Sequence, residues 1–391
     1  MFLLSTTIFF LVPILGIFLV VLGFFIDSKK SSIGYALMIG LFFGIVSYYF
    51  IPPETYDLFR HHEVVQKVMG FSLQEFLNIS KGMSAQLSEV EFLPLCISYL
   101  VGITGNVNLL QFVIVSLGYT ILFYLLYDYR KESNISTFSF IILTFFIFLG
   151  FNALNFISGL WFYLATLIFA LAFYFDYIKK KKKFLCYLLY IIPVLLHTAL
   201  IFPLAILVLY KFFGNKLSMK VILITVCGLT FPIFILHFLN QIISIPLFMT
   251  IERMYHSYFT QNDSMYVFYG GITFLLEIVK LGIVIGAIYF QNKRYKYKGI
   301  NGFILLLSIA ILVMVPQTII MIRFCMLLQF IGIVPLLDSF SSITKNKVLY
   351  LFVILFITFI SFFYQMRLFT GQSFGELWSQ RVLDPLISIL Q

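Results

Sequence analysis

Titratable side chains cluster in the stretch FIPPETYDLFRHHEVV, which contains Asp57, Arg60, His61 and His62. Asp57 and His61 are four residues apart, so one helical turn would put them on the same face. A carboxylate beside an imidazole raises the basicity of the ring, which predicts a general base at neutral pH. The guanidinium of Arg60 can bind phosphate oxygens at two points. The stretch therefore predicts proton transfer next to an anionic ligand.

Three further residues are candidates for the same chemistry. Arg323 interrupts apolar sequence in VPQTIIMIRFCMLLQF, where an unpaired charge costs about 3 kcal/mol on insertion scales. We therefore expect an anion or a carboxylate to meet it. Arg253 lies in a polar connection and is a candidate third arginine of the same kind. His197 stands alone in an apolar run and is open to two interpretations, a packed histidine or a second candidate base.

Composition identifies the class of protein. Hydrophobic residues make up 61% of the 391 residues and charged residues only 11%, against about 25% charged in soluble domains. Apolar runs near 20 residues recur along the chain, which predicts an all-α, polytopic membrane protein. The net charge of +10 comes from Lys and Arg clusters between these runs, a pattern typical of membrane topology rather than of nucleic-acid binding. No HxxxH, HExxH or CxxC spacing occurs, so we expect no metal site and no cofactor.

The basic clusters also predict the topology. Placing each cluster on the cytoplasmic side, by the positive-inside rule, puts both termini and the connections 52–106 and 246–270 outside. The first connection contains a predicted interfacial helix, and residues 1–391 are expected to form a single transmembrane domain. About ten spans fit this scheme, at roughly 3–26, 33–51, 107–127, 135–151, 156–177, 221–245, 271–290, 300–319, 321–339 and 347–364.

Residues 184–210 do not fit a simple span. At ~1.5 Å per residue, a run of about 27 residues is too long for one crossing and too short for two. Pro193 and Pro203 would interrupt a continuous helix. We therefore predict a re-entrant hairpin or a broken pair of short helices with His197 near the tip. A single tilted helix is the alternative.

Two charges lie within a predicted span, in the sequence FLLEIVKLG. Glu277 and Lys280 are three residues apart and share a helix face, so a structural ion pair is the first interpretation. A proton or ion pathway is the alternative.

Several of these features resemble the Wzy-type, EpsG-like polysaccharide polymerases of bacterial capsule and exopolysaccharide assembly. The cluster in PPETYDLFRHH follows the second predicted span, as in that family. The segment from FNALNFISG to VLLHTALI is also similar, with an asparagine-bearing turn, a basic loop and an apolar helix ending in His-Thr. The arginine of MIRFCMLLQF is a third point of similarity. Coverage is nearly complete, although relatives often carry Arg-Gln where this chain reads NFISG.

The resemblance implies a GT-C-like, metal-independent glycosyltransferase embedded in the bacterial cytoplasmic membrane, with its site facing outward. Its substrate would be an oligosaccharide repeat unit on undecaprenyl diphosphate. The enzyme would move the growing glycan from that lipid onto a sugar hydroxyl of the next unit. The lipid bilayer, a chain-length regulator and a flippase of the same pathway are the implied partners, and no nucleic acid is.

The residues divide between two roles under this resemblance. Arg60 and Arg323 would bind the diphosphate, with Arg253 as a third contact, because guanidinium groups stabilise accumulating negative charge. His197, or His61 oriented by Asp57, would accept the proton of the acceptor hydroxyl.

Three other functions stay open at the level of sequence. A flippase for lipid-linked oligosaccharides would carry charge across the depth of the membrane, whereas here charge concentrates at the predicted outer ends. A membrane O-acyltransferase also uses Arg and His among about ten spans, but this chain has no Arg and His pair in its first span. A purely structural membrane subunit is the third alternative.

Overall fold

The chain is represented by a computed structural model, which describes residues 2–26, 32–54, 56–83, 92–132, 135–150, 153–228, 264–289, 298–313, 318–339 and 345–370. These residues form helices joined by turns and short connections, with one isolated bridge between Lys216 and Lys298. The all-α prediction is therefore confirmed for the described residues. By their internal contacts they divide into two compact units, Met1–Leu200 with Thr358–Gln391, and Ile201–Ile357. That the whole chain is one transmembrane domain stays a prediction.

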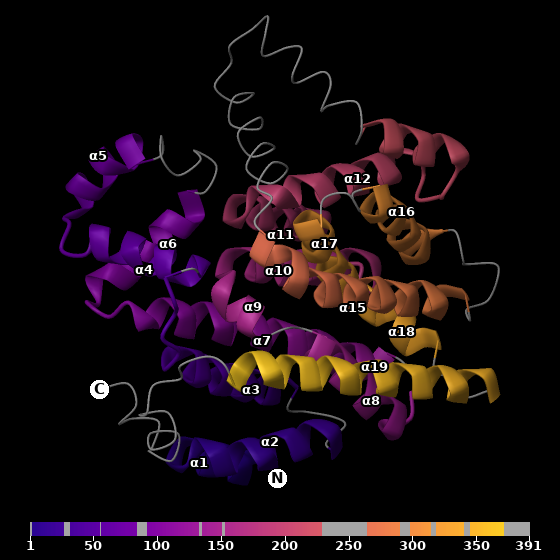
Figure 1. The fold of residues 1–391 in the computed structure, drawn as a ribbon, viewed down its shortest axis with the longest axis horizontal. Helices are drawn as coiled ribbons and strands as arrows, with labels where there is room; N and C mark the ends of the chain where they lie inside the picture. Colours follow the sequence, from indigo (N-terminus) through magenta and orange to yellow (C-terminus); the bar gives the residue numbers. More distant parts are fainter. Residues whose placement is uncertain are drawn as a thin grey trace, which may run out of the picture. The chain divides into compact units, whose positions relative to one another are not determined.

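The helices of the first unit follow one another along the chain as coloured in Figure 1. They are α1 (Phe2–Leu11), α2 (Pro13–Ile26), α3 (Ser32–Tyr48), α4 (Asp57–Val68), α5 (Leu73–Met83), α6 (Phe92–Ile103), α7 (Asn108–Glu132), α8 (Thr137–Gly150), α9 (Ala153–Ser158), α10 (Leu160–Tyr177), α11 (Lys183–Leu196) and the 3-10 helix η1 (Thr198–Leu200).

The second unit contains α12 (Ile201–Phe212), α15 (Ser264–Tyr289), α16 (Gly299–Val313), α17 (Thr318–Ile331) and α18 (Ile333–Ser339). Helix α19 (Lys345–Thr370) begins in this unit and ends in the first. The expected span 221–245 is described only to residue 228, with a helix over Met219–Gly228. The rest of that span, and the expected connection 246–270 up to residue 263, lie outside the described residues.

Two of the described helices are by themselves long and apolar enough to cross a membrane, Asn108–Lys131 and Leu160–Tyr177. A third qualifies if Met321–Ile331 and Ile333–Ser339, which meet at 49°, form one bent span. Most of the other expected spans in the described residues are shorter apolar helices, among them Val348–Phe363 within α19. Two or three helices are thus long and apolar enough to cross a membrane, and the number of about ten spans stays a prediction.

Helix breaks account for several of the short pieces. The expected span 3–26 is split at Val12, because Pro13 has no backbone N–H and cannot continue the helix before it. The span 156–177 is split at Gly159 and the span 321–339 at Gly332. The sequence predicted a span over each of these ranges without indicating a break, and each range is helical on both sides of its break.

Close packing of α3 against α7 forms the centre of the first unit, and Figure 1 shows the two helices side by side. Gly40 and Gly44, four residues apart, face α7. A methyl group on Gly40 would meet Thr120 and the carbonyl of Ser116, and one on Gly44 would meet the Ser116 hydroxyl. Small residues at this spacing let two helix backbones approach closely, which is how helices associate in membranes.

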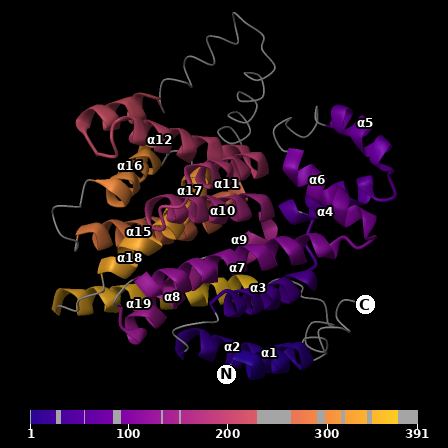
Figure 2. The same ribbon diagram turned by 180° about the vertical axis from the view of Figure 1, so that it is seen from behind.

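The segment 57–103 forms a group of three helices within the connection 52–106, where the sequence predicted an interfacial helix. Gly70 has φ +83°, a left-handed conformation that glycine adopts readily, and it separates α4 from α5. Ser72 and Glu75 then form a capping box, because the Glu75 carboxylate accepts the Ser72 N–H at 2.8 Å. Figure 2 shows α4 and α6 side by side.

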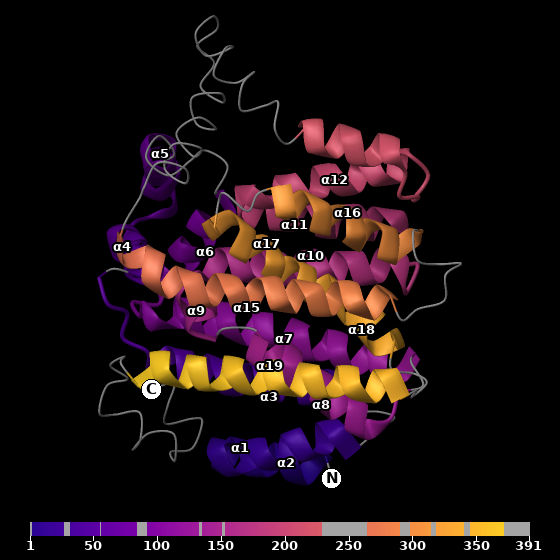
Figure 3. The ribbon, with the colours of Figure 1, turned by 45° about the vertical axis from the view of Figure 1, so that its right-hand side comes forward.

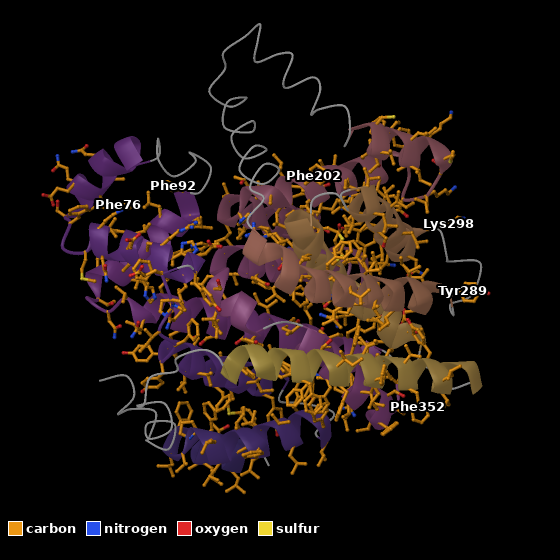
Figure 4. The ribbon with its side chains drawn as sticks, in the orientation of Figure 1. Phe76, Phe92, Phe202, Tyr289, Lys298 and Phe352 are labelled. Atoms are coloured by element: carbon orange, nitrogen blue, oxygen red, sulfur yellow. The ribbon has the colours of Figure 1, made fainter. Side chains whose placement is uncertain are left out.

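A small apolar core holds this group together. It contains Val68 of α4, Phe76 of α5, and Leu95 and Tyr99 of α6, all buried. Phe76, labelled in Figure 4, stacks on Tyr99 with ring centroids 4.2 Å apart. The carboxy-terminal end of α4, the helix that carries the titratable cluster, is thus part of a packed substructure.

The broken helix pair expected over 184–210 is present as α11 and α12, separated by His197 and η1. Pro193 and Pro203 lie within the two helices, and the break falls between them. The His197 N–H still donates to the Pro193 carbonyl at 2.8 Å, and helical geometry ends there. A pair of short helices with His197 at the junction is confirmed, and a re-entrant path through a membrane stays a prediction.

Candidate functional site

The titratable cluster lies on the first turns of α4. The chain enters this helix through an extended residue, Tyr56, after the Pro52–Pro53 dipeptide, and Asp57 occupies the first turn. A carboxylate there interacts favourably with the helix dipole. Asp57 also lies 3.6 Å from Arg60, whose side chain is 72% exposed. An exposed pair of this kind contributes little to stability, so Arg60 can leave Asp57 for an anionic ligand at small cost.

His61 is bound by an aromatic residue 100 positions away. The indole N–H of Trp161, on α10, donates to Nδ1 of His61 at 3.3 Å. The two rings meet edge to face, with centroids 5.8 Å apart and planes at 75°. Burial lowers the pKa of His61 from its usual 6.5 to about 4, and the carboxylate of Asp57 offsets only part of this effect. Asp57 thus raises the pKa of this ring as the spacing predicted, but burial lowers it by more.

His62, the next residue, faces a different partner. Its Nε2 lies 2.9 Å from Oε1 of Gln111 on α7, and both side chains are buried. An amide oxygen only accepts hydrogen bonds, so Nε2 of His62 carries the proton in this pair. Burial lowers the pKa of His62 as well. The two neighbouring histidines are thus fixed by separate helices, His61 by α10 and His62 by α7.

Gln111 also binds the end of α3. Its side-chain amide donates to the carbonyl oxygens of Ser47 and of Phe50, the latter at 3.0 Å. Carbonyl groups in the last turn of a helix have no partner within the helix and need one elsewhere. One fully buried glutamine therefore connects α3, α4 and α7.

His197 lies at the break that follows α11. Its Nδ1 accepts the N–H of Ala199 at 3.3 Å. Its ring meets Phe162 edge to face, with centroids 5.2 Å apart. Phe162 follows Trp161 directly in α10, which begins after Gly159. The first turn of α10 thus contacts both histidines that the sequence suggested as bases, His61 through Trp161 and His197 through Phe162.

The arginines proposed to share one ligand belong to different parts of the chain. Arg60 is in the first unit, whereas Arg323 is a partly buried residue of α17 in the second. Arg253 lies outside the described residues. The convergence of these three arginines on one anion stays a prediction.

The charges inside a predicted span are paired, as the sequence indicated. Nζ of Lys280 lies 2.7 Å from Oε1 of Glu277, and the two side chains are only 4% and 2% exposed. The other carboxylate oxygen of Glu277 accepts a hydrogen bond from Gln329 of α17 at 2.6 Å. Figure 3 shows α15 beside α17, the two helices that this network joins. The interpretation as a structural ion pair is supported, and Gln329 completes it.

Sequence reasoning missed three residues that organise these contacts: Gln111, Trp161 and Gln329. Each is a polar or partly polar side chain within apolar sequence, and both glutamines occur in the same tetrapeptide, LLQF. That isolation was a usable signal, because a buried amide must find hydrogen-bond partners. Within the described ranges there is no group of three or more His, Cys, Asp or Glu that could hold a metal ion. The expected absence of a metal and of a cofactor stays a prediction.

Comparison with known proteins identifies a family. The sequence model of the EpsG family matches residues 71–379, which is most of the chain. No curated protein and no solved structure matches it. The matched region includes Trp161, His197 and Arg323. It begins after α4, so Asp57, Arg60 and His61 lie outside it.

Proposed function

Because the chain belongs to the EpsG family, we propose that it is a polysaccharide polymerase acting on oligosaccharide repeat units carried by a polyprenyl diphosphate. The donor is a growing glycan on undecaprenyl diphosphate, and the acceptor is a sugar hydroxyl of the next lipid-linked unit. The observation that carries this proposal is the family match over residues 71–379. The many apolar helices support a membrane location, and we place the site at the outward face of the bacterial cytoplasmic membrane.

The proposed reaction is a glycosyl transfer. The bond between the anomeric carbon of the donor sugar and the diphosphate oxygen breaks, and a bond forms between that carbon and the acceptor oxygen. The acceptor hydroxyl gives its proton to a base, and the bonding electrons leave with the diphosphate. Arg60, Arg323 and Arg253 stabilise the charge on the leaving diphosphate without a metal ion, since guanidinium groups bind phosphate oxygens at two points.

We assign the role of base to His197. Its position beside Phe162, at the end of α10 that also contacts His61, supports a common site in the first unit. While Nδ1 of His197 accepts the Ala199 N–H, the neutral ring carries its proton on Nε2, so this hydrogen bond must open before either ring nitrogen can accept a proton from the acceptor. Asp57, a half-exposed residue of α4, is the alternative base.

A flippase is less well supported by the contacts. Glu277 and Lys280 are the charges deepest within an expected span, and a transport path would need them to face its ligand. They are instead buried and bound to each other and to Gln329. Satisfied buried pairs of this kind fix helix packing.

Besides the bilayer, the proposed partners are a chain-length regulator and a flippase of the same pathway.

The proposal is tested by deleting the gene and complementing with single variants. Loss of polymer, with single repeat units accumulating, is expected in the deletion. Hydrogen bonds to charged groups contribute about 1.5–3 kcal/mol, so Arg60→Ala and Arg323→Ala are expected to lower chain growth by about 10- to 100-fold. Lysine keeps the charge but lacks the planar fork, so Arg60→Lys and Arg323→Lys are expected to recover only part of it.

Lys67→Ala is the matched control for Arg60, because Lys67 is an exposed cation on the same helix. It is expected to support normal chain growth. The diphosphate role of the arginines is wrong if both lysine variants polymerise as fast as the wild type.

A further inference from the structure

The contact between Trp161 and His61 fixes where the histidine carries its proton. An indole N–H is a donor and never an acceptor, so Nδ1 of His61 must be the unprotonated nitrogen in this hydrogen bond. A neutral imidazole with an unprotonated Nδ1 carries its single proton on Nε2. Trp161 is almost fully buried and meets the imidazole edge to face, so the donor is held in place by packing.

The surroundings of His61 favour the neutral ring. Burial acts in that direction, and so does the positive charge of Arg60. Asp57 acts in the opposite direction, but its carboxylate is also paired with Arg60 on the same helix. A ring that loses its proton at about pH 4 is neutral at physiological pH and is a weak base there.

We propose that Trp161 holds His61 as a neutral imidazole with its proton on Nε2, so that His61 donates a hydrogen bond to a phosphate oxygen of the ligand and does not act as the base. The choice of a phosphate oxygen rests on the proposed function and on the neighbouring residue. Arg60 is an exposed cation one position earlier in α4, so an anion bound there comes within reach of the same helical turn. Trp161 is then a positioning residue, and His61 a ligand-binding residue.

This assignment separates the two adjacent histidines. His62 also carries its proton on Nε2, but it donates that proton to the buried Gln111 and cannot offer it to a ligand. His61 receives a hydrogen bond at Nδ1 from the protein and keeps its own N–H for another partner. His62 therefore anchors α4 on α7, whereas His61 binds the ligand.

Nitrogen NMR of the full-length protein in lipid nanodiscs tests the tautomer directly. The sample is labelled with ¹⁵N at histidine, and the His61 signals are identified by their loss in His61→Gln. Between pH 5 and 8 the His61 ring is expected to remain neutral, with an unprotonated Nδ1 and a protonated Nε2. Trp161→Phe keeps an aromatic ring but removes the N–H, and is expected to shift His61 toward a mixture of tautomers. Tyr99→Phe, which removes another aromatic donor in the first unit, should leave the His61 signals unchanged.

Inorganic pyrophosphate is the probe for the donor role. Adding it is expected to move the Nε2 signal of His61 in the wild type, and less so in Arg60→Lys. In the polymerisation assay His61→Gln keeps an N–H near the position of Nε2 and is expected to stay within about tenfold of the wild type. His61→Ala lacks that donor and is expected to lose about 100-fold.

Several results would overturn the proposal. It fails if wild-type His61 titrates near pH 6.5, if Trp161→Phe leaves the ring tautomer unchanged, or if pyrophosphate leaves the Nε2 signal in place. Equal loss of polymerisation in folded His61→Gln and His61→Ala would also contradict it, because a base cannot be replaced by an amide. If the wild type makes no polymer while the NMR results hold, the polymerase function fails and the donor assignment stands.

Discussion

Replacing Gln111 with methionine removes the hydrogen bond that connects α4 to α7 and those that connect α7 to the end of α3. Methionine has nearly the same length and volume, so the substitution leaves no large cavity and adds no bulk. The Nε2 proton of His62 loses its partner in a buried environment, and the carbonyl oxygens of Ser47 and Phe50 lose one hydrogen bond each. An unsatisfied buried polar group costs about 1–3 kcal/mol and each lost hydrogen bond about 0.5–1.5 kcal/mol, so the substitution is expected to lower the free energy of unfolding by about 4 kcal/mol.

Denaturation in mixed detergent micelles measures that loss, and hydrogen exchange of backbone amides locates it. Amides of α4 are expected to exchange faster in Gln111→Met, because the anchor of this helix on α7 is gone. Gln329→Met is the matched control. It replaces a buried glutamine in the same LLQF tetrapeptide, but Gln329 binds Glu277 in the second unit. It is expected to lower stability while leaving exchange in α4 unchanged.

The reasoning is refuted by either of two outcomes. A loss of less than about 1 kcal/mol in Gln111→Met would mean that the three groups find water or other partners after the substitution. Equal exchange in α4 for Gln111→Met and Gln329→Met would mean that His62 does not anchor this helix.

Three further predictions concern helix packing and pH. Lys280→Met leaves the Glu277 carboxylate buried without its cation and is expected to lower the free energy of unfolding by about 3–5 kcal/mol. The double variant Glu277→Gln with Lys280→Met is expected to recover most of that loss, and denaturant unfolding of both variants measures it. Gly44→Ala is expected to cost about 1–3 kcal/mol, because its methyl group meets α7, whereas Gly282→Ala, which meets no atom, is expected to cost nothing; thermal unfolding compares them. The folded-state pKa of His61 is below its unfolded value of about 6.5, so its contribution to stability is complete above pH 6.5 and is lost as pH falls toward 4. His61→Gln is therefore expected to show a smaller drop in melting temperature between pH 7.5 and 5, and an equal drop would contradict the lowered pKa.

Helices could be predicted from the sequence because apolar runs report burial directly. The all-α class and the break at His197 followed from run length and from two prolines. The breaks at Val12 and Gly332 were missed, since the apolar pattern continues across them and does not indicate a local change in backbone geometry. The contact between α3 and α7 was missed too. Hydropathy alone does not indicate that Gly40 and Gly44 allow another helix to approach closely.

The site was predictable in composition but not in arrangement. The spacing of Asp57 and His61 correctly placed them on one helix, yet it suggested a raised basicity. Burial of the ring outweighs that effect, and Trp161, 100 residues away, is one of the residues in contact with it. Local spacing specifies neighbours along a helix, whereas desolvation depends on elements that the fold brings in from elsewhere. The partners of Gln111 could not be predicted for the same reason, because they belong to α3 and α4.

Reconstitution of the purified protein in liposomes tests the central claim most directly. The substrate is a synthetic oligosaccharide repeat unit on polyprenyl diphosphate, and both glycan length and released polyprenyl diphosphate are measured. The account predicts glycans that lengthen by whole repeat units, with one polyprenyl diphosphate released for each unit joined. Transfer of the lipid between leaflets without any glycan longer than one repeat unit would contradict it.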